Sequence, residues 1–457
     1  MAISAAAGGR LGAGMSESQS AAKGLPGFRR IFRSLYYRNF RLFFIGHGVS
    51  VIGTWMQMIA AGWLAYDLTA GEPEGVRAVW LGVVAFAGRI PTFLLAPLAG
   101  VFVDRWDRRR LVITTQILSM IQAALLAALT LAHVITLWQL IVLSFILGLI
   151  NAFDVPARQS FVIEMVDKPV DLHNAIALNS MIVNGARMIG PAIGGILLKA
   201  LGAGFCFLTN AASYVAVIAA LLAMQVRPSG RRSAAGNILA NLHEGLRYAF
   251  GFAPVRNILL LLALVSLSGA SYPVLLPVFA QQVLHQGSGL YALLFAATGV
   301  GALAGAMFLA MRESVRGLSF WIAVAPAIMG LGLIGLGLSR LVWVSLLAMP
   351  VIGFGMMVQM ASSNTLIQTL VEDHMRGRVM SLYAMAFMGM VPLGGLLAGL
   401  MARWIGAPAT VAVNGLWCVV GSTLFFNQLK ALRRQIHPVY VKKGILADEF
   451  AGLPNTP

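Results

Sequence analysis

The chain has 457 residues, of which 59% are hydrophobic and only 11% are charged. Because soluble domains carry about 25% charged residues, this composition excludes an ordinary soluble protein and predicts a polytopic membrane protein. The chain has a formal net charge of +17, and its basic residues lie mostly between the apolar runs. This position favours anionic lipid headgroups over nucleic acid as their partner. Both cysteines, Cys206 and Cys418, lie inside apolar runs and predict neither a disulfide nor a metal site.

The N-terminal segment is expected to lie outside the membrane. Residues 1–26 are rich in Ala, Gly and Ser and have no apolar core that would make a signal peptide, so we expect a disordered tail. After it, Phe28, Ile31, Phe32 and Leu35 share one helical stripe. This stripe predicts a short helix on the membrane surface within a tail of residues 1–38, and a simple basic flank to the first span is the alternative.

Twelve apolar runs follow, each near the roughly 20 residues that hydrocarbon requires of a spanning helix. Their expected bounds are 40–67, 78–103, 110–131, 135–154, 174–199, 204–225, 257–283, 289–311, 318–339, 341–364, 378–403 and 407–428. No alternation of apolar and polar residues indicates a barrel, so we predict an all-α integral membrane protein. The longest connection, 226–256, divides it into six-helix halves at 39–225 and 257–428, followed by a tail at 429–457.

The distribution of basic residues predicts the orientation. If the N-terminus is inside, nearly all of the 33 Lys and Arg residues fall on the inner side, and only Arg77, Lys199, Arg340 and Arg403 fall on the outer side. This bias places both termini in the cytoplasm.

The two halves repeat each other in sequence. The connection after the second span reads "AGVFVDRWDRRRL", and the matching connection in the second half reads "AGAMFLAMRESVRGL". Likewise "GPAIGG" in the fifth span is echoed by "VPLGG" in the eleventh. Two six-span halves in parallel repeat predict an alternating-access transporter, with the substrate site between the halves near the middle of the membrane.

The charged connection after the second span carries a family resemblance. The pattern of Gly100, Asp104, Arg105, Arg108 and Arg109 resembles the signature loop of the major facilitator superfamily. The resemblance implies the fold of that superfamily and a cytoplasmic latch between the halves that is made in one conformation and broken in the other. Asp154 and Arg158, at the inner end of the fourth span, are the expected partners. Asp107 stands where the family usually has Gly, and the alternative role of the arginines is orientation alone.

A narrower resemblance covers almost the whole chain. The blocks that carry it are "LYYRNFRLFFIGHGVSVIGTWMQMIAAGWLAYDLT", "GRIPTFLLAPLAGVFVDRWDRRRL", "DVPARQSFVIEMV", "NAIALNSMIVNGARMIGPAIGG" and "RGRVMSLYAMA". They resemble the bacterial branch of the enterobactin exporter and macrolide-efflux-like proteins. This resemblance implies export of siderophores or amphiphilic drugs from the cytoplasm across the bacterial inner membrane, and we expect a monomer.

The "GPAIGG" block also resembles the fifth-span motif of drug exporters, but Ala186 replaces one of its glycines. Gly190, Pro191, Gly194 and Gly195 are therefore helix-packing candidates as well.

Two arginines lie inside spans. Arg89 is about halfway through the second span, and Arg187 is near the middle of the fifth, on one helix face with Asn184. A central arginine costs roughly 2.5–3.5 kcal/mol on insertion scales, so it normally faces a cavity or a partner. If both face one cavity, an anionic amphiphile is the favoured substrate; bonding to helix-end carbonyls or to a neighbouring Asn is the alternative. The weaker cavity candidates are Gln57, Asn151, Tyr272, Gln359, Asn364 and Tyr383.

No carboxylate occupies the centre of a predicted span. Asp67, Asp154 and His47 are the titratable groups nearest to the spans, and they are the candidates for proton coupling. No metalloprotease, nucleophile-elbow or Walker motif is present, so we expect neither an enzyme nor a cofactor. Import of a metabolite, flipping of a lipid and a non-transporting membrane sensor are the alternatives to export of a small molecule.

Overall fold

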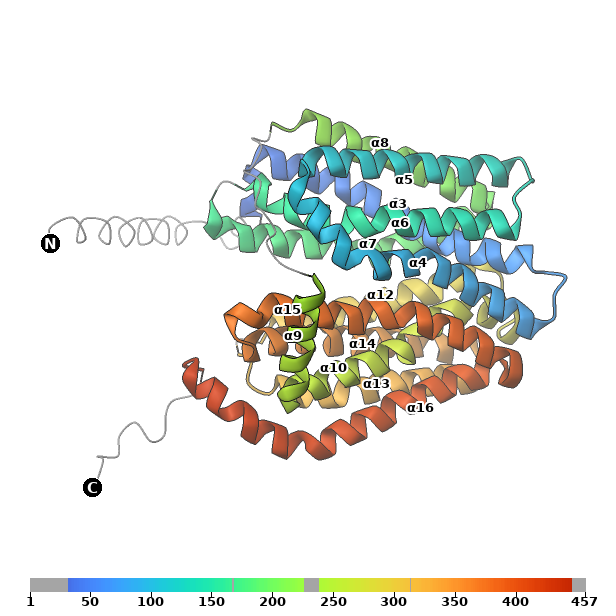
Figure 1. Cartoon of the computed structure of the whole chain (residues 1–457). Helices are drawn as coiled ribbons and strands as arrows, with labels where there is room; N and C mark the ends of the chain where they lie inside the picture. Colours follow the sequence, from blue (N-terminus) through green and yellow to red (C-terminus); the bar gives the residue numbers. More distant parts are fainter. Residues whose placement is uncertain (1–31, 167, 226–237, 313, 446–457) are drawn as a thin grey trace, which may run out of the picture.

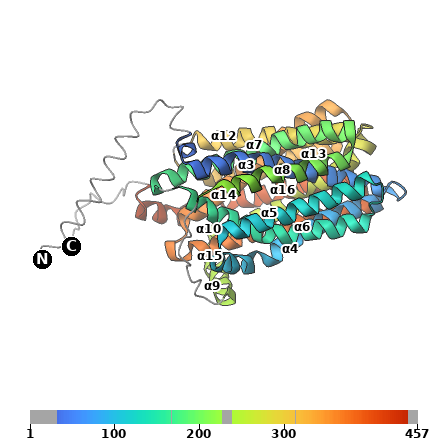
Figure 2. The ribbon, with the colours of Figure 1, turned by 90° about the horizontal axis from the view of Figure 1, so that it is seen from above.

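The computed structural model describes residues 32–166, 168–225, 238–312 and 314–445, and the regular elements in these ranges are helices (Figure 1). The helices form two bundles that pack against each other, one from α3 to α8 and one from α10 to α16. Seen from above, the long helices of both bundles run in roughly the same direction (Figure 2). The end that carries η1 and α9 is called the inner end here, and the opposite end the outer end, after the predicted topology.

Six long helices make up the N-terminal half. They are α3 (Arg38–Leu68), α4 (Glu74–Arg105), α5 (Arg108–Leu131), α6 (Leu137–Val162), α7 (Pro169–Leu201) and α8 (Ala203–Ala223). Within this half, the largest difference from the predicted spans is at α6, which continues past residue 154 to Val162. An apolar run measures the part of a helix that lies in hydrocarbon, whereas α6 continues beyond it because Ala157 and Phe161 are still buried in the bundle.

The seventh span is not a continuous α-helix. It consists of α10 (Ala253–Leu267), the 3-10 helix η3 (Gly269–Leu275), α11 (Leu276–Val278) and the π-helix η4 (Phe279–Val283). Pro273 lies inside η3 and Pro277 inside α11. A proline has no N–H to donate and clashes with the preceding turn, so it breaks regular α-helical bonding. The apolar run predicts this span but not its interruption.

The remaining helices complete the C-terminal half. They are α12 (Ser288–Ala310), α13 (Leu318–Leu338), α14 (Val342–Leu370), α15 (Asp373–Ala384), the π-helix η5 (Met385–Gly389) and α16 (Met390–Lys442). Eleven segments of the described chain are long and apolar enough to cross a membrane, and the last of them covers Asp373–Lys442. Gly406 bends it, with φ 79° and ψ 158°, a conformation that essentially only glycine adopts. The bend separates two spans, which confirms the predicted fold of twelve spans.

Two predicted segments on the inner side are the central connection and the surface helix before the first span, and the structure describes each of them only in part. The connection predicted at 226–256 contains a helix, α9 (Ile238–Gly251), whose Glu244 pairs with Arg378 of α15 at 2.5 Å. The predicted surface helix lies mostly outside the described residues, as does the tail before it. Where the description begins, the chain forms the short 3-10 helix η1 (Arg33–Tyr36).

Candidate functional site

The two halves meet through small residues from the outer end inward. A Cβ atom on Gly82 of α4 would lie 2.9 Å from the Gly395 carbonyl oxygen of α16. A Cβ atom on Gly299 of α12 would lie 2.8 Å from the Met188 Cα atom of α7. Such contacts exist because glycine lets helix backbones approach closely. Of the ion pairs between described residues, each lies within one half or joins the C-terminal half to α9.

The predicted latch connection is described in part. Gly100, Asp104 and Arg105 lie in the last turns of α4. The structure describes their backbone and does not describe the side chains of Asp104 and Arg105. Asp107, which departs from the family pattern, caps α5: its carboxylate accepts a hydrogen bond of 2.8 Å from the Arg110 backbone N–H. An aspartate at this position stabilises the first turn of the helix.

The two following arginines bond within the N-terminal half. Arg108 forms an ion pair of 2.6 Å with Glu164, in the 3-10 helix η2 (Ile163–Met165) after α6. Arg109 donates from Nε to the Leu221 carbonyl oxygen at 3.0 Å and from NH2 to that of Leu222 at 2.9 Å. The last carbonyls of a helix have no partner within the helix, so Arg109 caps the inner end of α8.

Asp154, Arg158 and His47 form one cluster at the inner end of the N-terminal half, in which Asp154 and His47 are buried and Arg158 is half-buried. The Asp154 carboxylate is 3.1 Å from NH2 of Arg158 and accepts hydrogen bonds from Thr115 and Gln116 of α5 at 2.8 and 2.7 Å. NH1 of Arg158 lies 3.3 Å from Nδ1 of His47 on α3. The cluster therefore joins α3, α5 and α6 and brings together two of the coupling candidates. The third, Asp67, is exposed at the outer end of α3 and interacts electrostatically with Arg77.

Arg89 and Arg187 both lie against α3, where Met58 and Trp55 are one turn apart, and their charges interact. The Arg89 side chain is exposed, and its nearest polar partner is the Met58 sulfur of α3 at 3.8 Å. The Arg187 guanidinium lies 5.4 Å from the centre of the Trp55 ring, and its Nε and NH1 atoms are buried without a hydrogen-bond partner among the described residues. Two positive charges at membrane depth thus lie beside the same stretch of α3, and no carboxylate of the described residues neutralises them.

The other half contributes a tyrosine to the same place. Tyr272 lies in the interrupted part of the seventh span, is 2% exposed, and its hydroxyl donates to Thr298 of α12 at 3.3 Å. The Tyr272 hydroxyl also interacts electrostatically with Arg187. Next to it the Trp55 and Phe295 rings are 6.0 Å apart, a further contact between the halves. The site therefore combines two cations and an aromatic wall, a set of groups that can bind an anionic amphiphile.

Three of the other cavity candidates, Gln57, Asn184 and Tyr383, have hydrogen-bond partners. Gln57 is 4% exposed and lies in a chain of amides, accepting from Asn210 at 2.6 Å and donating to Gln122 at 3.0 Å. Asn184 donates to the Ser180 carbonyl oxygen of its own helix, and Tyr383 donates to that of Met360. Gln359 is 1% exposed, and its amide has no hydrogen-bond partner among the described residues.

The glycines of the "GPAIGG" block face two different helices. A Cβ atom on Gly190 would lie 2.9 Å from the Ile52 carbonyl oxygen of α3, and one on Gly194 would lie 3.1 Å from the Met56 Cα atom. A Cβ atom on Gly195 would instead collide with Ala292 of α12, in the other half. Pro191 lies inside α7 between these contacts. The block holds α7 close to α3 and to the opposite half at once.

Several residues of these sites were missed in the sequence, among them Phe295 of α12. Trp55 and Met58 lie one turn apart on α3, and Glu164 follows α6. An aromatic residue and a methionine in an apolar span carry no signal that separates a site from ordinary packing. Glu164 is one acidic residue in an inner loop, and nothing in its spacing points to Arg108.

Comparisons with known proteins agree with this architecture. A family model described as transmembrane secretion effector matches residues 31–437. The chain is 26% identical over 387 residues to the staphyloferrin A transporter of Staphylococcus aureus, covering 84% of this chain and 95% of that protein. It is 25% identical to the multidrug efflux pump Tap of Mycolicibacterium fortuitum, covering 75% and 89%. It is 24% identical to the enterobactin exporter EntS of Citrobacter koseri, covering 89% and 95%.

Solved structures share the fold at low identity. The POT family transporter PepTSo superposes with a TM-score of 0.67 at 15% identity, covering 87% of this chain and 99% of that chain. A D-xylose–proton symporter superposes with a TM-score of 0.66 at 13% identity, covering 85% and 97%. The chain is a multi-pass membrane transporter and not an enzyme, and it belongs to the transmembrane secretion effector family of the major facilitator superfamily.

Proposed function

We propose that this transporter exports a small amphiphilic molecule from the cytoplasm by alternating access. The observation that carries the proposal is the contact between the halves, which runs through Gly82, Gly195 and Gly299 from the outer end to the depth of Arg187. A carrier closed on one side of a central site has such an arrangement. The efflux pump and the exporter among the relatives support the outward direction.

The distribution of charge supports the proposed orientation. With both termini in the cytoplasm of a bacterial cell, the basic inner side faces the anionic headgroups of the inner membrane. Residues 39–225 and 257–428 are then the two moving halves, and α9 belongs to the cytoplasmic linker between them. Nothing in this arrangement requires a second copy, so the proposed unit is a monomer.

The proposed substrate is an anion with an apolar part. Arg89 and Arg187 repel each other, and the buried Nε and NH1 atoms of Arg187 have no described partner. An anionic group placed between the two guanidinium groups would relieve the repulsion and accept the free N–H bonds. Trp55, Phe295 and Met58 would contact the apolar part.

We expect purified protein to bind the small aromatic anion 2,3-dihydroxybenzoate more tightly than the cation tetraphenylphosphonium. Arg89→Gln and Arg187→Gln should each weaken binding of the anion roughly tenfold, the size expected for a lost charged hydrogen bond. Titration calorimetry in detergent measures both ligands. Arg340→Gln, which removes one positive charge at the outer end, is the control and should bind as wild type. Preference for the cation, unchanged in the two central variants, would contradict an anionic substrate.

The proposed latch acts on the conformational cycle rather than on substrate binding. Asp104 ends α4 beside the connection whose Arg108 and Arg109 bond within the N-terminal half in this conformation. A latch that forms in the other conformation would favour the inner-closed state without touching the substrate.

Asp104→Asn should therefore slow transport of 2,3-dihydroxybenzoate into inside-out membrane vesicles roughly tenfold or more. Its dissociation constant, measured by calorimetry, should stay near the wild-type value. Asp107→Asn makes the same chemical change three residues away, and asparagine also caps helices, so this control should transport normally. Wild-type transport rates in Asp104→Asn would rule out the latch.

Proton coupling is proposed to involve Asp154 and its cluster. Asp154 is 2% exposed and is bonded to Arg158, which in turn contacts His47. Protonation of the carboxylate would remove the charge that holds Arg158, so the position of that arginine would depend on the proton. Asp67 lies exposed at the outer end and is the second candidate.

We expect Asp154→Asn to abolish the stimulation of vesicle transport by an imposed pH gradient, whereas Asp67→Asn should retain it. Because the single variant leaves the half-buried Arg158 without its carboxylate, which can destabilise the protein, the double variant Asp154→Asn with Arg158→Gln is measured beside it. Both should still exchange substrate without a gradient. Full gradient-driven transport in the double variant would exclude the cluster from coupling.

A further inference from the structure

The last helix does not end where the twelfth span leaves the bilayer. After Gly406 α16 runs without a break to Lys442, past the predicted end of the span at residue 428. In this extension, Leu429, Leu432, Ile436 and Tyr440 are buried. Their spacing of three and four residues puts them on one face of the helix. The extension is thus an amphipathic helix with its apolar face on the C-terminal half.

Contacts at its far end hold the extension on the inner surface. The Tyr440 hydroxyl donates to the Val315 carbonyl oxygen at 3.4 Å, and the Lys443 ammonium donates to that of Val371 at 3.4 Å. Arg316 donates to the Ile445 carbonyl oxygen at 3.1 Å. The extension is therefore tied to the inner loop before α13 and to the inner loop before α15, and it crosses the end of the bundle (Figure 1).

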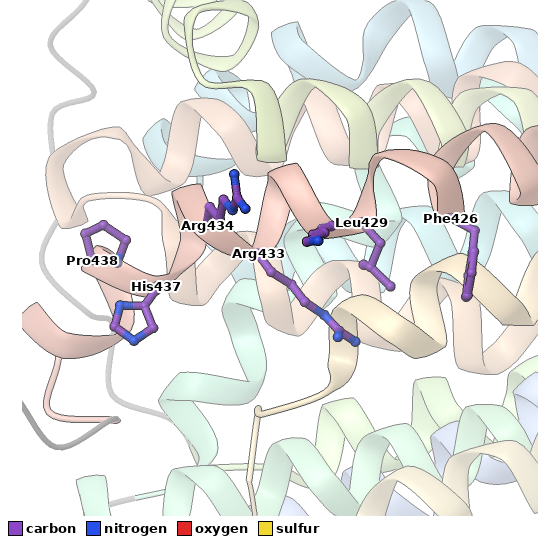
Figure 3. A pocket seen from close by; sticks show the side chains of 7 residues that line it. Phe426, Leu429, Arg433, Arg434, His437 and Pro438 are labelled. Atoms are coloured by element: carbon purple, nitrogen blue, oxygen red, sulfur yellow. The ribbon is translucent and has the colours of Figure 1, made fainter. Parts of the chain in front are cut away.

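A groove runs along the extension beside this buried stripe, and Leu429 of the stripe borders it (Figure 3). Its volume is about 760 Å³, and its lining is Phe426, Leu429, Lys430, Arg433, Arg434, His437 and Pro438. The lining contains three permanent positive charges and a histidine, and it contains no acidic residue. Within the described chain, no ion pair or side-chain hydrogen bond engages Lys430, Arg433 or Arg434.

The position of the groove relative to the membrane distinguishes a phospholipid from a free phosphate as its ligand. Phe426, which is 49% exposed, belongs to the last turn of the predicted span, and Arg433 and Arg434 follow two turns later. Apolar groups at the edge of the hydrocarbon and cations just outside it match the two parts of one phospholipid. A free phosphate would use the cations alone and leave Phe426 and Leu429 unoccupied.

We propose that this groove binds an anionic phospholipid of the inner leaflet. Its phosphate oxygens accept from Lys430, Arg433 and Arg434, and the start of an acyl chain packs on Phe426 and Leu429. Clusters of basic residues directly beyond a spanning helix bind anionic headgroups, and the amphipathic extension lies in the plane where those headgroups are. The lipid would anchor the C-terminal half while the N-terminal half moves. The binding itself does not depend on the transport proposal.

The test uses the purified full-length chain in detergent and counts bound lipids by native mass spectrometry. Phosphatidylglycerol should remain bound at concentrations where phosphatidylcholine does not. The triple variant Lys430→Gln, Arg433→Gln and Arg434→Gln should weaken phosphatidylglycerol binding roughly 100-fold, because each basic residue near an anionic surface contributes several-fold. The matched variant Arg41→Gln, Arg110→Gln and Arg247→Gln removes three exposed inner charges outside the groove and should bind as wild type.

Three results would overturn the proposal. Equal loss in both triple variants would mean diffuse attraction rather than a site. Displacement of the lipid by soluble glycerol phosphate at equal concentration would mean a free-phosphate site. The third result is unchanged phosphatidylglycerol binding in the triple variant of Lys430, Arg433 and Arg434. If this variant also elutes from size-exclusion chromatography as wild type does, the result would exclude the groove as the lipid site.

Discussion

Hydrocarbon offers no partner to a polar group, so every such group inside the membrane must find one in the protein or face water. Most polar side chains in these spans follow this constraint: Gln57, Gln122 and Asn210 form a chain of amides. Asp154 is held by an arginine and two neutral donors. The Gln359 amide is one exception, since it is buried without a hydrogen-bond partner among the described residues. Arg89 and Arg187 are the charged exceptions, since they interact with each other and no described carboxylate lies beside them. The proposed substrate site follows from this imbalance of charge.

The contact between the halves is suited to being made and broken. It is built from glycines against backbone and from aromatic rings, such as Trp55 on Phe295. Breaking a buried ion pair would cost several kcal/mol, because one charge would stay buried without its partner. Separating these uncharged surfaces does not carry that cost. The ion pairs of the described chain instead stiffen each half, as Arg108 with Glu164 does. The halves can therefore move as bodies around a site whose two arginines belong to one half and whose tyrosine belongs to the other.

The fold was predictable because length and hydropathy alone fix a spanning helix, and the spans were found to within a few residues at most ends. Local backbone geometry was less accessible: the 3-10 helix that carries Tyr272 depends on how Pro273 packs, and the helix α9 depends on its contact with α15. For the site, the energetic cost of a charge at membrane depth singles out Arg89 and Arg187 from their positions in the apolar runs. Trp55 and Gln57 show the limit, since both lie in one apolar span and only tertiary packing distinguishes a residue beside the arginines from one that joins helices.

If the halves alternate around the arginine site, distances between spin labels on the two halves must change during transport. One pair, at positions 110 and 374, spans the inner end, and another, at positions 72 and 340, spans the outer end, all four being exposed. With 2,3-dihydroxybenzoate bound under an imposed pH gradient, we expect a new population in which the inner distance shortens and the outer distance lengthens. Distances that stay fixed at both ends, or that change in the same direction, would contradict alternating access in this protein.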